Sequence, residues 1–533
     1  MGVGRFSLAL LVSASVLAAC GGGGGGGGST GGSVTGSTGG AGGVTPPPVS
    51  AGGEWLTFTP SSAALTTYEG EDSTFTITAK SSRLYEKSFN IGIFDSKGVV
   101  TTDVKLVTKS VIEYAATLKT SKALPAGTHT TNLEVRVCED EPQVCAKPFP
   151  GSPWRVPVSV TVKPQSTLSQ QGVIPGVPAW STYQGNAAHN GFVPATFDPA
   201  KFSRRWTIPA SNALPSAAVI DNGKAFVVRG NSLISWRLEA INEDTGETAW
   251  SVDFGKLDQV NDPAAANGKV YLTSTGKQDS FFWVFDQGTG KLLSKTPMTL
   301  SGLGYHYYAP TVFEDKIYTG SDHDNGGVSK FSDPDGRLEW QSRMSNDWFE
   351  WTPAVDSTYV YGFISGTLTA LRKTDGRSMF NIGTPFSAFS GTGLVLGDQM
   401  AYAPSHATLF GFDLAKQSIA WSFDNLPRGM PALSKDTLYT LAERGTRLEA
   451  RTTTTGALKW TANVDDVGCN MCSVVATNKH IFVSLDIETL AIDIDSHAVV
   501  WRHPLGGKLA ISNRGVLYIV NPNSGQIAAI NLQ

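Results

Sequence analysis

Short apolar runs separated by glycine-containing turns repeat along the C-terminal two-thirds of this chain. Eight repeats begin near Ala217, Ala264, Pro310, Pro353, Gly393, Pro431, Ser473 and Leu509. In the clearest one, Ala218–Ile220, Lys224–Val228 and Leu238–Asn242 are followed by a closing Trp250. Apolar runs bounded by Asp-Asn-Gly and Thr-Gly turns are typical of antiparallel strands, so each repeat predicts a four-stranded meander.

The repeat length indicates how these meanders assemble. The closing positions fall 39 to 47 residues apart, which is close to the length of a propeller blade. They are Trp206, Trp250, Leu293, Trp340, Phe380, Trp421, Trp460 and Trp501. Because a lone meander cannot bury both faces, residues 179–533 predict an eight-bladed β-propeller. Trp206 precedes the first complete repeat and the last repeat has no closing aromatic, so the strand around Trp206 is expected to complete blade eight.

Residues 54–165 lack the repeat but alternate between apolar and polar positions. Clear stretches are Ser73–Thr78, Phe89–Phe94, Asn132–Val137 and Val156–Val162. Several such strands with turns between them predict an immunoglobulin-like β-sandwich. The alternative, a membrane-type barrel, would need longer strands with apolar residues facing outward. Residues 166–178 are then expected to link the two domains.

The N-terminus has the pattern of an export signal. Arg5 precedes the apolar run Leu8–Leu17, which is too short to span a bilayer and ends close to Cys20. Residues 1–19 resemble a lipoprotein signal peptide, so Cys20 is expected to become a lipid-carrying N-terminus; an ordinary secretory signal is the alternative. Residues 20–53, rich in Gly, Ser and Pro, predict a flexible tether with a reach of about 30 Å. By the same resemblance, Gly21 implies an outer-membrane location, facing the periplasm or the cell surface.

Four further cysteines form two close pairs. Cys138 and Cys145 flank a polar segment, and Cys469 and Cys472 flank two residues in a predicted turn. Export permits disulfides, so both pairs are expected to be structural disulfides. Metal binding is the alternative for the first pair and redox activity for the second, which lacks a helix to activate a thiol.

Charge and motifs narrow the function classes. The formal net charge is -4 and charged residues make up 17% of the chain, which argues against a nucleic-acid partner. The sequence contains no nucleophile elbow, Walker loop or zinc-protease motif, so neither a catalytic residue nor a metal site is predicted. The short acidic segment Asp322–Gly327 is interpreted as a solvated hairpin.

A candidate binding site lies in segments that lead from one blade to the next. In a propeller these segments gather around the mouth of the central channel. The expected mouth residues are Tyr305, His306, Tyr308, Trp348, Trp351 and Arg428. Exposed aromatics beside arginine are typical of interface hot spots, but the same rings could instead pack between blades and stiffen the hub.

Two segments carry a family resemblance. Leu238–Trp250 and the lead-in Trp180–Gly191 resemble repeats and opening segments of the pyrroloquinoline quinone (PQQ) enzyme-like propeller superfamily. That superfamily contains quinone dehydrogenases and also non-catalytic scaffolds, such as the BamB family of outer-membrane assembly lipoproteins. The resemblance implies a lipid-anchored envelope scaffold that binds envelope proteins and needs no cofactor. The alternatives are a glycan-binding propeller and a PQQ-dependent dehydrogenase, although the adjacent cysteine pair of those dehydrogenases is missing.

Overall fold

The computed structural model describes residues 55–533 except 86, 102, 232, 234, 277–278, 299–308, 322–326, 334, 345–350, 387–392 and 465–466, together with the backbone of Val12–Ala14. Its regular structure consists of strands and short 3-10 turns, which confirms the all-β prediction. The turns are η1 (Tyr183–Gly185), η2 (Pro199–Lys201) and η4 (Glu443–Gly445). The chain divides into two compact units, Met1–Gln165 and Ser166–Gln533. Over the described residues, no helix has the length and apolarity needed to cross a membrane.

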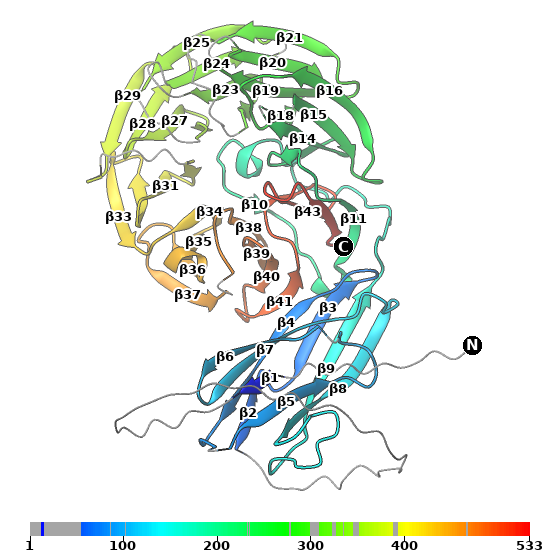
Figure 1. Cartoon of the computed structure of the whole chain (residues 1–533). Coiled ribbons are helices and arrows are strands. Elements are labelled where there is room, and N and C mark those ends of the chain that lie inside the picture. Colours follow the sequence, from blue (N-terminus) through cyan, green and yellow to red (C-terminus); the bar gives the residue numbers. More distant parts are fainter. Residues whose placement is uncertain are drawn as a thin grey trace, which may run out of the picture. The chain divides into compact units, whose positions relative to one another are not determined.

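The first unit contains two sheets (Figure 1). One has the order β1 (Val12–Ala14), β5 (Phe89–Phe94), β8 (Gly127–Cys138), β9 (Trp154–Lys163) and β3 (Ala63–Tyr68). The other has the order β2 (Leu56–Thr59), β4 (Thr74–Ser81), β7 (Glu113–Lys119) and β6 (Lys105–Ser110). Only β3 and β9 pair in parallel among these described strands; the other pairs are antiparallel.

The alternation seen in the sequence places the core between the two sheets. Along β9, Val156, Val158 and Val160 are buried while the residues between them are more exposed. They share one hydrophobic cluster with Leu133 of β8 and Leu118 of β7, which belong to different sheets. Because successive side chains of a strand point to opposite faces, the valine repeat gives this sheet one apolar inner face.

The described strands of the second unit form eight sheets arranged in a ring, with the last strand of most sheets on the outer rim (Figure 1). The first four sheets are β12 (Leu214–Pro215), β13 (Val219–Asp221), β14 (Lys224–Asn231), β15 (Ser235–Asn242) and β16 (Thr248–Gly255); β17 (Gln259–Val260), β18 (Ala264–Ala266), β19 (Lys269–Thr275), β20 (Phe281–Asp286) and β21 (Leu292–Pro297); β22 (Thr311–Phe313), β23 (Lys316–Ser321), β24 (Gly327–Ser332) and β25 (Leu338–Arg343); and β26 (Ala354–Val355), β27 (Tyr359–Ile364), β28 (Thr367–Arg372) and β29 (Ser378–Gly383).

The remaining four sheets complete the ring. They are β30 (Val395–Leu396), β31 (Met400–Ser405), β32 (Thr408–Asp413) and β33 (Ser418–Asp424); β34 (Arg428–Ser434), β35 (Thr437–Ala442), β36 (Arg447–Thr452) and β37 (Leu458–Asn463); β10 (Phe192–Val193), β38 (Ser473–Thr477), β39 (His480–Ser484), β40 (Thr489–Asp493) and β41 (Val499–His503); and β11 (Ser203–Ile208), β44 (Ile527–Asn531), β43 (Val516–Val520) and β42 (Lys508–Ile511). All residues of β38, β39 and β43 are buried, whereas β16 alternates between exposed and half-buried positions. Neighbouring sheets therefore cover both faces of the inner strands, as expected for buried sheets.

Four of the closing tryptophans each bond to the sheet that follows their own. Trp206 Nε1 donates to Glu243 O at 2.9 Å, and Trp250 Nε1 donates to Gln287 O at 3.1 Å. Trp340 and Trp421 make equivalent bonds, to Lys373 O and Thr453 O. Each indole thus satisfies its only donor in a turn of the following sheet, which explains why a tryptophan recurs where the repeat ends.

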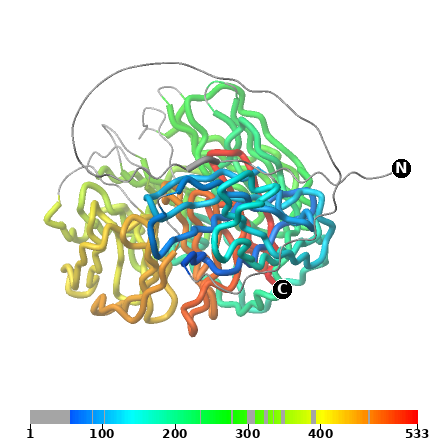
Figure 2. Tube along the Cα trace, turned by 60° about the horizontal axis from the view of Figure 1, so that its bottom comes forward, coloured from blue at the N-terminus to red at the C-terminus, as the bar shows by residue number. Residues whose placement is uncertain are grey.

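The two ends of the second unit close the ring. β11 pairs with β44 in antiparallel fashion, which confirms the prediction that the strand around Trp206 completes the last sheet (Figures 1 and 2). Arg205 is 1% exposed and donates to Glu243 O, Asn531 Oδ1 and Asp244 Oδ1. A buried guanidinium with these partners ties the N-terminal strand to the first and the last sheet at once.

Residues 166–178, expected to be a linker, make hydrogen bonds within the second unit. Thr167 N donates to Arg204 O, and Ile174 N donates to Asn513 O. Ser169 O accepts from Arg205, and Asn531 donates to Thr167 O. This segment therefore runs along the second unit, where these backbone groups find their partners.

Candidate functional site

The lead-in segment, Trp180–Gly191, contacts the inner side of the ring sheet by sheet. The bonds run in sequence order: Trp180 O accepts from Ile220 N, Ser181 O from Ala265 N, Ala187 O from Val355 N, Ala188 O from Leu396 N, Asn190 O from Leu433 N and Gly191 O from Ala476 N. Thr182 Oγ1 donates to Pro310 O ahead of the third sheet. The twelve residues of the lead-in segment therefore connect seven of the eight sheets. They form part of the wall of the hub, which is the centre of the ring.

His189 fixes the middle of this segment. Its side chain is 0% exposed, with Nδ1 at 3.2 Å from Leu394 O and Nε2 at 3.0 Å from Thr311 Oγ1. A carbonyl only accepts, so Nδ1 carries a proton directed at Leu394 O, while Nε2 faces Thr311 Oγ1, whose hydroxyl donates to Pro353 O. Burial lowers the pKa of His189 to about 3, partly offset by the bond to Leu394. His189 is therefore a neutral structural group and not an acid–base catalyst near pH 7.

A pocket of about 420 Å³ opens beside the lead-in segment. Its wall consists of residues from the lead-in and from the segments that enter the inner strands. They are Trp180, Thr182, Tyr183, Gln184, Ala217, Ala218, Val219, Asp262, Ala309, Gly393, Pro404, His406, Pro427, Arg428, Gly429, Met430, Asn470, Cys472, Ser473, Lys508 and Leu509. We call this the hub pocket. Its volume lies in the range of small-molecule and peptide-anchor sites.

The charged residues of the hub pocket are mostly cationic. Arg428 is exposed at the start of β34, and Lys508 is half-buried at the start of β42. Asp262 is 3% exposed and is the one carboxylate among the described residues of this wall. Two cations and one buried carboxylate make the accessible part of the pocket favourable for anionic groups.

The predicted mouth residues differ in where the structure places them. Arg428 lines the hub pocket, as the binding interpretation expects. Trp351 does not: it is 0% exposed and packs with Tyr318 and Val360, so its role as an exposed anchor is wrong and the hub-packing alternative holds for it. Its ring fits because two glycines face it, Gly320 and Gly362, where a Cβ would lie 3.0 and 3.2 Å from the indole. Tyr305, His306, Tyr308 and Trp348 lie outside the described residues, and so does Cys20.

Sequence reasoning missed several residues of the pocket. Lys508, His406 and Met430 line it, although none was predicted. Lys508 begins the inner strand β42 as Arg428 begins β34, and Met430 lies two residues after Arg428 in β34. Comparing equivalent positions across the repeats would have found Lys508, whereas attention to aromatic clusters did not.

Both predicted disulfides are present. Cys138 pairs with Cys145 and Cys469 pairs with Cys472. In the described part of the chain, the only cluster with metal-ligand chemistry is Cys138, Asp140 and Cys145. Its sulfurs are bonded to each other, and the Asp140 carboxylate accepts from Ala146 N and Lys147 N. This cluster therefore closes a loop and has no free thiolate for a metal.

Comparisons with known proteins extend this picture. BamB from Moraxella catarrhalis has 15% sequence identity, with 62% of this chain and 99% of that chain covered and a TM-score of 0.49. The quinohemoprotein alcohol dehydrogenase from Comamonas testosteroni has 12% identity, with 66% and 80% covered and a TM-score of 0.52. A europium-containing methanol dehydrogenase has 12% identity, with 67% and 98% covered and a TM-score of 0.51. At such identities the likeness to the two dehydrogenases shows the fold alone.

Searching the curated proteins gives no match. The sequence profile of one family, described as outer membrane protein assembly factor BamB, matches residues 189–301 and 324–533. These ranges span more than half of the chain and include strands of all eight ring sheets, although β22 and β23 of the third sheet lie outside them. The chain therefore belongs to the BamB outer-membrane assembly factor family, with a PQQ-like repeat propeller as its second unit.

Proposed function

We propose that this protein is a non-catalytic scaffold of the bacterial cell envelope that binds other envelope proteins through its propeller. The observation that carries the proposal is the family match over the ring. Family members are described as assembly factors of the outer membrane, so outer-membrane assembly or secretion components are the partners we infer. A ring of sheets on a fixed hub holds its connecting loops in place, which suits a docking platform.

The mouth of the hub pocket is the surface we assign to partner binding. Arg428 is exposed there and Lys508 is half-buried beside the same cavity. Arginine is enriched among interface hot spots because its planar guanidinium binds carboxylates and stacks on rings. Ala309, the residue after Tyr308 in the chain, lines the same pocket, which keeps Tyr305, His306 and Tyr308 as candidates for this surface.

The finer architecture belongs to the same proposal. We infer that the eight sheets of the second unit are eight propeller blades and that the two-sheet first unit is immunoglobulin-like. Residues 1–19 would be removed and Cys20 lipidated, so that residues 20–53 tether the folded units to the outer membrane. The first unit then acts as a spacer or as a second binding module.

Site-specific photo-crosslinking in cells tests the scaffold role. A photoreactive amino acid at Arg428 should capture a discrete envelope protein, identifiable by mass spectrometry. The matched control is the same amino acid at Leu293, which is 46% exposed on the rim strand β21. Capture of the same protein from both positions, or of none from Arg428, would contradict the assignment of the mouth.

A quinone dehydrogenase is the competing class, because solved members share the fold. The described residues of the hub pocket do not fit a calcium-bound quinone: Asp262 is their only carboxylate, whereas calcium takes six to eight oxygen ligands. Cys469 and Cys472 are also separated by two residues, unlike the adjacent pair of those enzymes. Added PQQ and calcium should produce no dye-linked oxidation of alcohols or sugars, and saturable turnover would overturn the non-enzyme proposal. The glycan alternative depends on the aromatic mouth residues and stays a prediction.

A further inference from the structure

The outer edge of β5 in the first unit is covered by only three residues. On one side β5 pairs with β8 along Asn90 to Phe94. On the other side β1 pairs with it in antiparallel register, Val12 opposite Ile91 and Ala14 opposite Phe89. The fold itself thus shows that this edge accepts an added strand.

The covering strand belongs to the segment that we propose is removed on export. β1 lies within the apolar run Leu8–Leu17, ahead of Cys20. Alternate residues of a strand point their N–H and C=O groups to opposite sides, so β8 can satisfy only about half of the β5 backbone. Removal of β1 therefore leaves the other half of these groups at a free sheet edge.

The β5 edge also lacks the features that normally prevent pairing. Its sequence from Phe89 to Phe94 contains no charged residue and no proline. The other sheet ends in β6, which contains Lys105 and Lys109 and has a register shift between Thr108 and Ser110. Lysines and bulges are common protections of edge strands. The β6 edge therefore carries such protections, whereas the β5 edge is covered by β1 alone.

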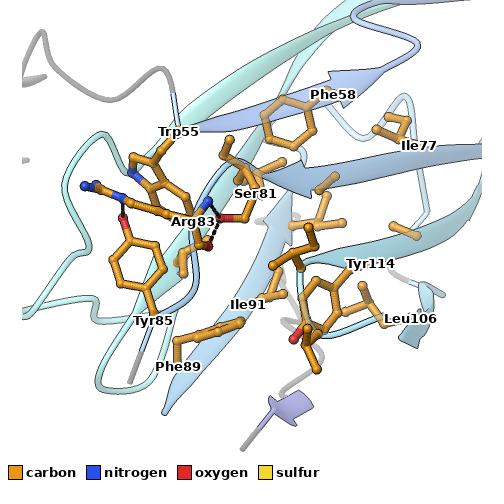
Figure 3. Close-up of a pocket in the computed structure, with 18 of the residues that line it drawn as sticks. Trp55, Phe58, Ile77, Ser81, Arg83, Tyr85, Phe89, Ile91, Leu106 and Tyr114 are labelled. Carbon is orange, nitrogen blue, oxygen red and sulfur yellow. Dashed lines mark hydrogen bonds between the residues drawn. The ribbon is translucent and has the colours of Figure 1, made fainter. Parts of the chain in front are cut away.

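An apolar pocket lies beside β5, between the two sheets. Phe89 and Ile91 of β5 line it from one sheet, and Leu106 and Tyr114 line it from the other (Figure 3). Ile93 of β5 also lines it. These five side chains are only half-buried. The cavity volume is about 50 Å³, far below the several hundred Å³ of small-molecule sites, so it suits single inserted side chains and not a free ligand.

The outer face of β5 is closed by the loop of the first disulfide. Asn90 Nδ2 donates to Asp140 O, and a Cβ on Gly92 would lie 2.6 Å from Pro142 Cβ. An incoming strand can therefore reach β5 along its edge, with alternate side chains directed toward the pocket between the sheets.

We propose that the processed protein uses β5 as a β-augmentation site for an extended, uncharged segment of a partner protein with apolar residues at alternate positions. Main-chain bonds to β5 supply the register, and the apolar side chains fill the space beside Ile91 and Leu106. This site is separate from the hub pocket and rests on removal of the leader, not on the scaffold function of the propeller.

A peptide with the sequence of residues 8–17, flanked by lysines for solubility, is the probe. It is titrated into protein that begins at residue 20 and has Cys20→Ala, with fluorescence anisotropy and hydrogen exchange as readouts. Saturable binding and slowed exchange in β5 are expected. The control peptide has Ala14→Pro, which keeps an apolar side chain but removes the N–H that would face Phe89 of β5, and it should bind at least about tenfold more weakly.

Two surface variants locate the site. Val111 lines the pocket and is 59% exposed, so Val111→Lys should weaken binding by about tenfold without unfolding the sandwich. Val107 is 44% exposed but does not line the pocket, so Val107→Lys should change affinity less than about twofold. Equal binding of both peptides, equal effects of both lysines, pairing of β5 with a second copy that excludes the peptide, or a mature protein that retains residues 12–14 would each overturn the proposal.

Discussion

The indole of Trp250 lies across Gly290, so closely that a Cβ on this glycine would be 2.5 Å from Trp250 Cε3. The same relationship recurs between Trp206 and Gly246 and between Trp340 and Gly376, each glycine with a positive φ in a turn of the following sheet. The glycine of each turn thus serves two purposes: it adopts the left-handed conformation and leaves room for the neighbouring tryptophan.

Gly290→Ala tests this contact against a matched glycine. Gly268 has the same φ of +72°, but a Cβ there would meet nothing within 4 Å. Gly268→Ala should therefore cost about 1 kcal/mol of unfolding free energy from backbone strain alone. Gly290→Ala should cost about 1 to 3 kcal/mol more, since the Trp250 ring must move. Urea denaturation measures both; equal losses would mean that the ring contact is unimportant.

We expect the buried side chain of Arg205 to contribute strongly to the closure of the ring. Arg205→Ala removes four hydrogen bonds, to Glu243 O, Ser169 O, Asn531 and Asp244, at a side chain that is 1% exposed. The expected loss of unfolding free energy is about 3 kcal/mol. The control is Arg337→Ala, whose ion pair with Asp335 is solvent-exposed, and it should stay within about 0.5 kcal/mol of wild type. A small effect of Arg205→Ala would show that strand pairing alone closes the ring.

Because the His189 imidazole is buried, we expect the folded protein to lose stability in mild acid. The folded protein keeps this imidazole neutral down to a pKa of about 3, whereas an unfolded histidine binds a proton below about pH 6.5. Between these values the unfolded state holds one more proton, so stability falls as the pH decreases. This one group should remove about 2 kcal/mol of unfolding free energy between pH 7 and pH 5.

Two asparagine variants check that assignment. His189→Asn keeps a donor and tolerates the φ of +56°, and it should flatten the pH dependence by about one proton. His406 also has a positive φ, of +55°, and it is exposed, so His406→Asn is the matched control for replacing a histidine in this backbone conformation. Denaturation midpoints followed from pH 5 to pH 8 give the slopes, and an unaltered slope in His189→Asn would rule out this histidine as the cause.

We expect Cys20 to attach the protein to the membrane. Cys20→Ala should move the protein from the membrane fraction to the soluble periplasm or leave an uncleaved precursor, because the proposed lipid attachment site is lost. Fractionation with immunoblotting and intact-mass analysis distinguishes these outcomes from wild type. Continued partition of a normally processed variant with outer membranes would show that another feature holds the protein there.

The strands and their repeat could be predicted because their signals are local. Alternation along Val156–Val162, the Thr-Gly turns and the spacing of the closing tryptophans are all written within a few residues or at a fixed period. The pairing of β11 with β44 followed from counting closing aromatics. The candidate site was harder: Arg428 was found, but Trp351 is buried because distant Gly320 and Gly362 make room for its ring.

The sequence by itself determined an all-β chain whose second unit repeats with the period of a PQQ-like propeller, because hydrophobic periodicity and turn residues act over short distances. Only the tertiary structure decided that the lead-in segment bonds to seven sheets, that burial lowers the pKa of His189 at its centre, and that the uncharged strand β5 pairs with β1 at its edge. These features depend on contacts between residues far apart in the chain, whose partners are chosen by packing and burial.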